Sequence, residues 1–174
     1  MQLPTHFIAG ALIDEALARV HLPGWARILT TGGLAYLSHG VLDKLAKATY
    51  HPPEPLDDAF WKGYHQRVLP VFTWATVLAL APRHAFAMLC AALPDLDWVV
   101  RGISRRTGRA IPGWEKPVLN EGLHDLLNRV PVVKELNRLP DWRTERKGVL
   151  VEAGLVAVML AALFWFMRRK DSVR

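Results

Sequence analysis

His39 and Asp43 stand near the end of an apolar segment, residues 36–51, and their spacing could bind a metal ion. They are four residues apart in the sequence. On a helix this spacing places them about 40° apart on one face, one turn from each other. An imidazole nitrogen and a carboxylate oxygen arranged in this way are ordinary ligands of zinc or a similar divalent cation. A hydrogen bond between the two side chains on the helix surface is the alternative interpretation.

Further polar residues interrupt apolar surroundings and favour the metal interpretation. Asp95 and Asp97 lie in Leu93–Trp98, beside an apolar run in which unpaired carboxylates would be costly to bury. They could bridge one or two cations, or Asp95 could instead cap the following helix. His124 is a candidate ligand on a predicted short helix, and the adjacent Asp125 could orient a ligand imidazole.

His6 begins another predicted helix, where the helix dipole disfavours the protonated imidazole and leaves it free to bind metal. Asp14 would lie roughly 80° around the same helix and fits the cluster poorly. His51 precedes two prolines that hold it rigidly, so it could close the site or transfer a proton. Lys44 could meet an anionic substrate, although solvent is the usual environment of a lysine. The predicted metal ligands are His6, His39, Asp43, Asp95, Asp97 and His124, and the predicted catalytic residues are His51, Lys44 and Asp125.

The elements that must position these residues are predicted to be helices, and no strand alternation or internal repeat is present. Helices are expected at about 5–20 with Thr5 as the N-cap, at 25–48, 68–81, 85–93, 118–127 and 132–139. Pro82 is expected to separate the third from the fourth, and neither reaches the ~20 residues of a full membrane span. They are expected to be buried core helices or helices partly sunk in a bilayer. Residues 101–117 are expected to form a basic loop, and His21, His65 and His84 to lie at the surface or in an aromatic rim.

The segment 149–167 is predicted to be a transmembrane anchor. Its one charged residue, Glu152, lies near the start and is expected to reach water. At ~1.5 Å per residue the segment spans roughly 28 Å, close to the hydrocarbon thickness of a bilayer. A buried core helix is the alternative, and the cations at 168–170 argue against it. The prediction is therefore an all-α helical bundle with a C-terminal transmembrane helix, divided into a helical, membrane-associated metal-site domain at 1–142 and the anchor with its basic tail at 143–174.

Composition and charge favour a membrane partner. The chain is 51% hydrophobic and 22% charged with a net charge of +6, and its mean hydropathy is +0.12. Basic clusters at 101–109 and 168–170 follow apolar runs, a placement that favours an anionic membrane lipid surface over nucleic acid. No nucleic-acid-binding pattern is present. The single cysteine, Cys90, excludes an internal disulfide and a cysteine-based zinc site. The sequence does not indicate an oligomeric state.

Three short patches, THFIAGALI, SHGVLDK and LPDLDW, resemble in their order the bacterial inner-membrane family of membrane-bound metal-dependent hydrolases. That family is similar in its helical layout to zinc-dependent phospholipases C. The patches lie within about the first 130 residues. The resemblance implies location in the bacterial inner membrane. Carried over by residue, it implies His6, His39, Asp43, Asp95 and Asp97 as metal ligands, with His124 as a sixth.

The chain also departs from these families. It begins Met1–Gln2 where the zinc phospholipases have a tryptophan, and the histidine-threonine-histidine type of motif of the membrane hydrolases is missing. The resemblance therefore supports a metal site more than a particular reaction. The positive-inside tendency predicts a cytoplasmic C-terminus.

Two functions remain open from the sequence. The first is a membrane-bound hydrolase that uses a divalent metal, with zinc favoured, to cleave a phosphoester such as a phospholipid head group; the loop Arg101–Arg109 would hold the phosphate. The second is a non-enzymatic integral membrane scaffold or assembly protein. In it the acids and histidines form buried structural pairs, such as Asp43 with His39 or Lys44, and Asp97 with Arg101.

Overall fold

The computed structural model describes residues 1–171, and in these residues the secondary structure is helical without strands, which confirms the predicted all-α class. The longer elements are α1 (Leu3–Leu17), α2 (Gly24–Leu45), α4 (Leu69–Ala92), α5 (Leu96–Thr107), α6 (Leu119–Asn128) and α8 (Gly148–Asp171). The shorter ones are η1 (Ala46–Ala48), α3 (Ala59–Gly63), η2 (Tyr64–Val68), η3 (Leu93–Asp95), α7 (Pro131–Glu135) and η4 (Leu136–Arg138).

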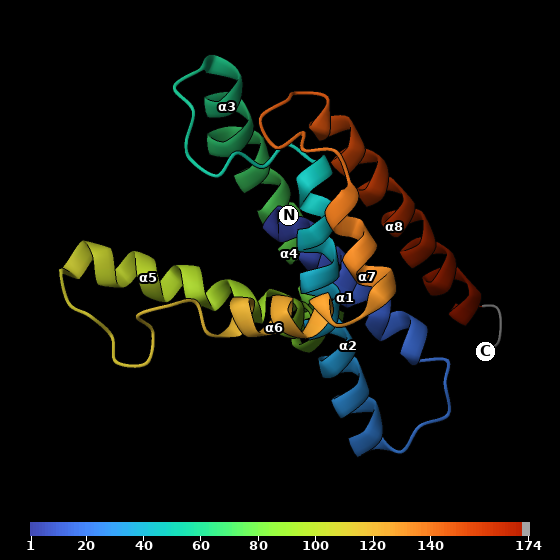
Figure 1. Cartoon of the computed structure of the whole chain (residues 1–174). Coiled ribbons are helices and arrows are strands. Elements are labelled where there is room, and N and C mark those ends of the chain that lie inside the picture. Colours follow the sequence, from blue (N-terminus) through green and yellow to red (C-terminus); the bar gives the residue numbers. More distant parts are fainter. Residues whose placement is uncertain (172–174) are drawn as a thin grey trace.

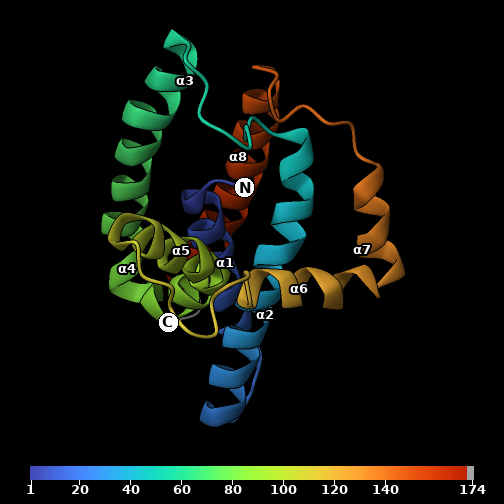
Figure 2. The same ribbon diagram turned by 60° about the vertical axis from the view of Figure 1, so that its left-hand side comes forward.

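Helix α1 lies at the centre of the bundle, with α2, α4 and α8 packed around it (Figures 1 and 2). Its closest neighbour is α4, because small residues line the contact. A Cβ atom at Gly10 would stand 2.6 Å from the carbonyl oxygen of Ala87 and 3.1 Å from Cβ of Ala91. Any larger residue at this position would force the two helices apart, so Gly10 sets how near α1 approaches α4.

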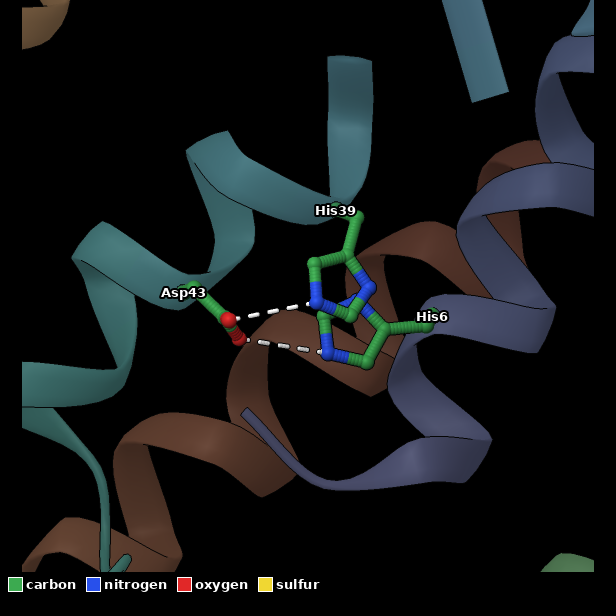
Figure 3. Close-up of side chains that lie close together, drawn as sticks. All are labelled: His6, His39 and Asp43. Atoms are coloured by element: carbon green, nitrogen blue, oxygen red, sulfur yellow. Dashed lines mark ion pairs between the residues drawn. The ribbon is translucent and has the colours of Figure 1, made fainter. Parts of the chain in front are cut away.

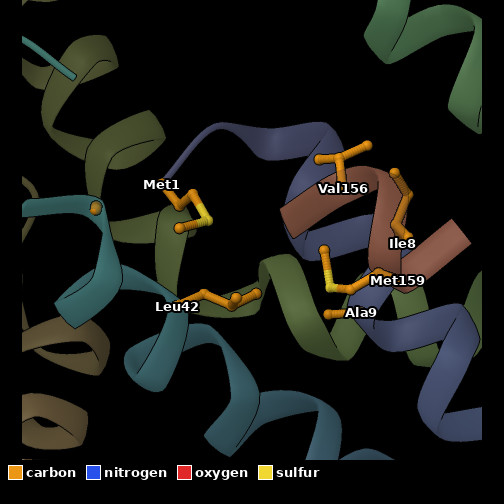
Figure 4. Packing of buried hydrophobic residues seen from close by; sticks show 7 residues of the cluster. Met1, Ile8, Ala9, Leu42, Val156 and Met159 are labelled. Carbon is orange, nitrogen blue, oxygen red and sulfur yellow. The ribbon is translucent and has the colours of Figure 1, made fainter. Parts of the chain in front are cut away.

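Helix α8 contributes to the same hydrophobic core as α1 and α2 (Figure 4). The buried cluster consists of Met1, Ile8, Ala9, Leu42, Ala46, Val156 and Met159. Its members come from the start of the chain, the end of α2 with η1, and the middle of α8. The C-terminal helix therefore packs on the bundle along one face and leaves the opposite face exposed.

Glu152 and Thr5 do not have the predicted roles. Glu152 is 4% exposed, and its Oε1 accepts hydrogen bonds from Thr5 Oγ1 at 2.8 Å and from the Gln2 backbone N–H at 3.1 Å. Gln2, rather than Thr5, is the N-cap residue of α1. The carboxylate is held inside the bundle because the first turn of α1 supplies the hydrogen-bond donors that a buried acid needs.

The predicted break at Pro82 is wrong. Pro82 lies inside α4, which continues unbroken to Ala92. Proline removes one backbone hydrogen bond, and the packing of α4 on α1 outweighs that loss. As a consequence, the helical stretch Ala59–Thr107, which includes α4, is long and apolar enough to cross a membrane. The same is true of Gly148–Arg169.

Helices α5 and α6 run crosswise to the long helices at about the middle of the view, and α5 projects away from the bundle (Figure 1). Helix α5 extends to Thr107, so the first part of the expected basic loop is helical, and it ends at Gly108 with a φ of 66°. Helix α6 packs closely on α2 because Gly40 has no side chain. A Cβ at this position would overlap the side chains of Leu123 and Leu127. This contact brings one face of α6 beside the end of α2 that carries His39.

Candidate metal centre

The side chains of His6, His39 and Asp43 meet where α1 crosses α2 (Figure 3). One ligand atom from each lies within 4.8 Å of the other two. His6 Nε2 is 3.3 Å from Asp43 Oδ1, and His39 Nε2 is 3.2 Å from Asp43 Oδ2. The two imidazole rings stack with centroids 3.9 Å apart and planes 16° from parallel. Both histidines have 0% exposure.

The hydrogen bonding of His39 prepares its other nitrogen for a cation. His39 Nδ1 is 2.8 Å from the carbonyl oxygen of Ala91. A carbonyl can only accept, so Nδ1 carries the proton and, in the neutral imidazole, Nε2 presents a lone pair. His39 Nε2 and both nitrogens of His6 are buried without a hydrogen bond of good geometry. Buried polar atoms are ordinarily satisfied, and a divalent cation beside Asp43 would satisfy the Nε2 atoms of His6 and His39.

The distances within the cluster also suit a metal. Two ligand atoms of one tetrahedral zinc, bound at roughly 2.0–2.1 Å, lie about 3.3 Å apart. The separations between the Asp43 oxygens and the nitrogens of His6 and His39 are 3.3 and 3.2 Å. Each imidazole nitrogen therefore stands at ligand spacing from one oxygen of Asp43, and the three donor groups lie within 4.8 Å of one another.

His6 and Asp43 have the charge states that a metal site needs, whereas His39 is protonated more readily than a free imidazole. Burial lowers the pKa of His6 to about 4, so its imidazole is neutral at pH 7. Burial lowers the pKa of His39 as well, but the carboxylate of Asp43 outweighs it and the net shift is upward. Burial would raise the pKa of Asp43, yet the imidazoles of His124, His39 and His6 hold that pKa far below its usual range. Asp43 is consequently an anion in the middle of the cluster.

Asp95 and His124 stand at the edge of the cluster. Asp95 Oδ1 lies 3.7 Å from His39 Nε2, and His124 Nε2 lies 3.7 Å from Asp43 Oδ2. They reach it from η3 and α6, so four separate elements supply the charged and imidazole groups. Both are near enough to join the inner ligands after a small movement of their side chains.

Two groups beside Asp43 were not predicted from the sequence. Asn120 Nδ2 lies 3.5 Å from Asp43 Oδ2, and the amino group of Met1 lies 2.5 Å from Oδ1. Asn120 precedes His124 by four residues, which places both on one face of α6 and is a signal that could have found it. The amino group has no comparable signal, because only the tertiary fold brings it to residue 43.

A cavity of about 610 Å³ adjoins the cluster. Its wall includes Asp43, His51, Asp95, Trp98, Asn120, His124 and Arg143. Burial lowers the pKa of His51 to about 4, and His51 Nδ1 has no hydrogen-bond partner of good geometry. The Arg143 guanidinium is held by Asp141, at 3.0 and 2.6 Å from its two oxygens. The cavity thus combines the metal-type donors with a neutral imidazole and a fixed cation.

Asp97 was predicted as a ligand, but other groups engage both of its oxygens. It has 0% exposure; Oδ1 accepts a hydrogen bond from Trp114 Nε1 at 2.7 Å, and Oδ2 accepts one from the Asn120 backbone N–H at 2.8 Å. The expected partner Arg101 instead stacks over the ring of Trp98, 5.2 Å from its centroid. Asp97 therefore anchors the start of α6 and holds Asn120 in place.

Lys44 and Asp125, both predicted as catalytic, are not in the cavity wall. Lys44 Nζ donates hydrogen bonds to Asn128 Oδ1 at 2.7 Å and Asn137 Oδ1 at 3.0 Å. Because Lys44 directly follows Asp43, its side chain leaves α2 about 100° around the helix from that of Asp43. It points toward the end of α6 and toward η4. Asp125 is exposed on α6. Neither residue is placed where it would touch a molecule bound in the cavity.

A second cluster of histidine and carboxylates lies at the other end of α1. His84, expected at the surface, is 3% exposed. Its Nδ1 is 2.8 Å from Asp14 Oδ2, and its Nε2 is 3.7 Å from Glu15 Oε1. Arg27 Nη2 lies 3.3 Å from Asp14 Oδ1. As expected, Asp14 is not part of the His6 cluster.

We compared the chain with known proteins in three ways. No family model, no curated protein and no solved structure matches it. The site therefore has to be interpreted from its own geometry.

Proposed function

We propose that this chain is a membrane-bound, metal-dependent hydrolase acting on a phosphoester. The observation that carries the proposal is the convergence of His6, His39 and Asp43, whose buried nitrogens make no hydrogen bond of good geometry at the centre of the cluster, beside a cavity of about 610 Å³. The order of the three sequence patches that resemble membrane-bound metal-dependent hydrolases supports the same function.

His6, His39 and Asp43 would hold the metal, with Asp95 and His124 as further ligands. A bound zinc or similar ion supplies Lewis acidity, which activates water at neutral pH and polarises a phosphoryl oxygen. His51 would face the substrate from the cavity wall as a neutral imidazole, and its pKa of about 4 makes it a weak base for proton transfer at pH 7. Arg143 offers its remaining N–H donors to an anionic substrate oxygen.

The membrane part of the proposal rests on the two helical stretches that could span a bilayer, Ala59–Thr107 and Gly148–Arg169. The exposed side chains of α4 and α8 include Trp74, Leu78, Leu89, Val158 and Phe164. Large exposed apolar patches of this kind are unusual on proteins surrounded by water. The inner membrane of a bacterium, with the basic C-terminal end in the cytoplasm, remains the proposed location.

Metal analysis and chelator-sensitive hydrolysis test the proposal together. Purified protein should retain close to one equivalent of a transition metal, and His39→Ala should remove most of it. Turnover of a phosphodiester should disappear with chelator and return on adding metal. If the wild-type protein binds less than about half an equivalent and His39→Ala makes no difference, the enzyme proposal fails.

A non-enzymatic scaffold is the second candidate, and the cluster of Asp14, Glu15 and His84 favours it. That cluster shows that this bundle uses buried histidine–carboxylate contacts to pack helices. In a scaffold His6, His39 and Asp43 would do the same. Chelator-sensitive hydrolysis that is abolished by Asp43→Asn is incompatible with this alternative.

A further inference from the structure

An apolar groove of about 330 Å³ lies between the two stretches that could span a membrane. Helices η2 and α4 form one wall, α8 forms the other, and the first residues of α1 complete it. The volume is at the lower end of the ~300–1,000 Å³ of ordinary small-molecule sites. If α4 and α8 cross a bilayer, the groove opens toward the hydrocarbon of the surrounding lipid.

The groove exists because α8 presents small residues to α4. Its contribution is a single stripe along the helix, at residues 149, 152, 153, 156, 157 and 160. Ala153 and Ala157 lie one turn apart in the middle of this stripe, facing the part of α4 that contains Leu69 and Phe72. Larger residues at the two alanines would fill the space between the helices.

One end of the groove is polar. Glu152 lines it and is 4% exposed, with Oε1 satisfied by Thr5 and Gln2. Glu152 Oε2 has no hydrogen-bond partner of good geometry, although the Tyr64 side chain lies close to it. A buried acceptor in this state can take a hydrogen bond from a hydroxyl or amide of a ligand. The other end, at Phe72 and Leu160, is apolar.

The polar end adjoins the metal centre. Gln2 lines both this groove and the cavity beside His6, His39 and Asp43. Its side chain is held between them, with Nε2 donating to the carbonyl oxygen of Tyr50 at 3.2 Å. A ligand that extends past Gln2 would have its apolar part between α4 and α8. Its head would lie beside Asp43.

We propose that this groove binds one hydrocarbon chain of a membrane phospholipid whose phosphate-bearing head lies in the cavity beside His6, His39 and Asp43. The assignment of the head as the group that is hydrolysed rests on the proposed function. Binding of the chain depends only on the groove. The preferred ligand is therefore an amphiphile and not a water-soluble phosphoester.

Photocrosslinking tests the binding directly. The full chain is reconstituted in phosphatidylcholine vesicles that contain phosphatidylglycerol with a diazirine in one acyl chain, and labelled peptides are mapped by mass spectrometry. Ala157→Trp fills the groove. Val158→Trp is the matched control, because it adds the same side chain to the next residue, which is 68% exposed. Leu160→Trp blocks only the apolar end.

Labelling is expected in residues 64–72 and 149–160 above the level at the exposed positions Trp74 and Leu78. Ala157→Trp should reduce the groove labelling at least about tenfold, which corresponds to a loss of about 1.4 kcal/mol of binding free energy. Val158→Trp should leave it unchanged. Equal labelling of all the exposed positions, or equal labelling in the two tryptophan variants, would overturn the proposal. If Ala157→Trp does not fold, unchanged groove labelling in Leu160→Trp also overturns it.

A hydrolysis assay separates this inference from the proposed function. Ala157→Trp should raise the KM for a long-chain phospholipid while leaving the turnover of a short, soluble phosphodiester unchanged. If neither substrate is cleaved by the wild type but the groove is still labelled, the hydrolase proposal fails and the chain-binding groove stands. If both substrates are cleaved and Ala157→Trp changes neither rate, the groove proposal fails and the hydrolase stands.

Discussion

The two histidine–carboxylate clusters at opposite ends of α1 contain the same residue types but are arranged differently. His84 bonds Asp14 through Nδ1 at 2.8 Å, while its Nε2 lies 3.7 Å from Glu15 without a hydrogen bond of good geometry. His39 instead gives Nδ1 to the backbone carbonyl of Ala91 and keeps Nε2 for the centre of its cluster. Among the described residues, a grouping of three metal-type donors is found at the His39 end of α1 and not at the His84 end.

This difference shows that the hydrogen-bond partner of Nδ1 decides what a buried histidine can do. A carbonyl partner fixes the tautomer and leaves a lone pair for a cation. A carboxylate partner on another helix, such as Asp14 for His84, makes the same nitrogen part of a contact between helices. We therefore interpret the first cluster as a metal site and the second as a structural contact.

The largest expected effect is a difference in metal affinity between a variant of the first cluster and a variant of the second. Asp43→Asn removes the central anion and should weaken metal binding by more than the roughly 100-fold that losing a ligand's hydrogen-bond partner can cost. His84→Gln, the matched change at the other end of α1, should leave affinity within about twofold, because its contacts lie outside the metal cluster. Titration calorimetry and metal analysis measure both. Similar losses in the two variants would contradict the distinction.

The next effect concerns stability. His84→Leu removes the imidazole that lies 2.8 Å from Asp14 Oδ2, and losing a hydrogen bond to a charged group typically costs about 1.5–3 kcal/mol. We expect a clear fall in the melting temperature in detergent, with metal content retained. His21→Leu is the control, because His21 is exposed. An unchanged melting temperature for His84→Leu would show that the second cluster does not hold the helices together.

Metal addition should stabilise the folded protein through the first cluster alone. A ligand at about 100 times its dissociation constant adds about 2.7 kcal/mol to the free energy of unfolding. The melting temperature should rise on adding zinc to the wild type and to His84→Gln, and should not rise for Asp43→Asn. A rise of the same size in all three proteins would place the bound metal elsewhere.

The last expected effect is a pH dependence from the cavity wall. The pKa of His51 is lowered by burial to about 4, against 6.5 in the unfolded chain. Between these values the unfolded chain binds a proton that the folded protein does not, so stability falls as the pH decreases from about 6.5 toward 4, by at most about 1.4 kcal/mol per pH unit. In chelator, His51→Phe should lose less stability than the wild type over this range. Parallel melting curves against pH would argue that His51 is not buried in solution.

Several features follow from local patterns and were predictable. The His39–Asp43 pair depends only on helix periodicity, and the apolar length of 149–167 indicated a helix, which is α8. Asp95 and Asp97 show where local reasoning ends. Both follow the same apolar run, yet Asp95 lies 3.7 Å from His39 and Asp97 accepts hydrogen bonds from Trp114 and the backbone of Asn120. Asp95 and Asp97 are only two positions apart, yet their side chains have different surroundings. The position of α6 determines which of the two reaches the cluster.

The sequence by itself therefore determined the all-α class, the apolar C-terminal helix and the pairing of His39 with Asp43, because each depends on residues within a few turns of one helix. The tertiary structure alone decided that His6 and His124 join this pair, that Lys44 turns toward Asn128, and that Pro82 continues a helix. Those outcomes depend on close contacts such as those of Gly10 on α4 and Gly40 on α6. Such contacts join residues far apart in the chain, and the energy of packing them outweighs local preferences.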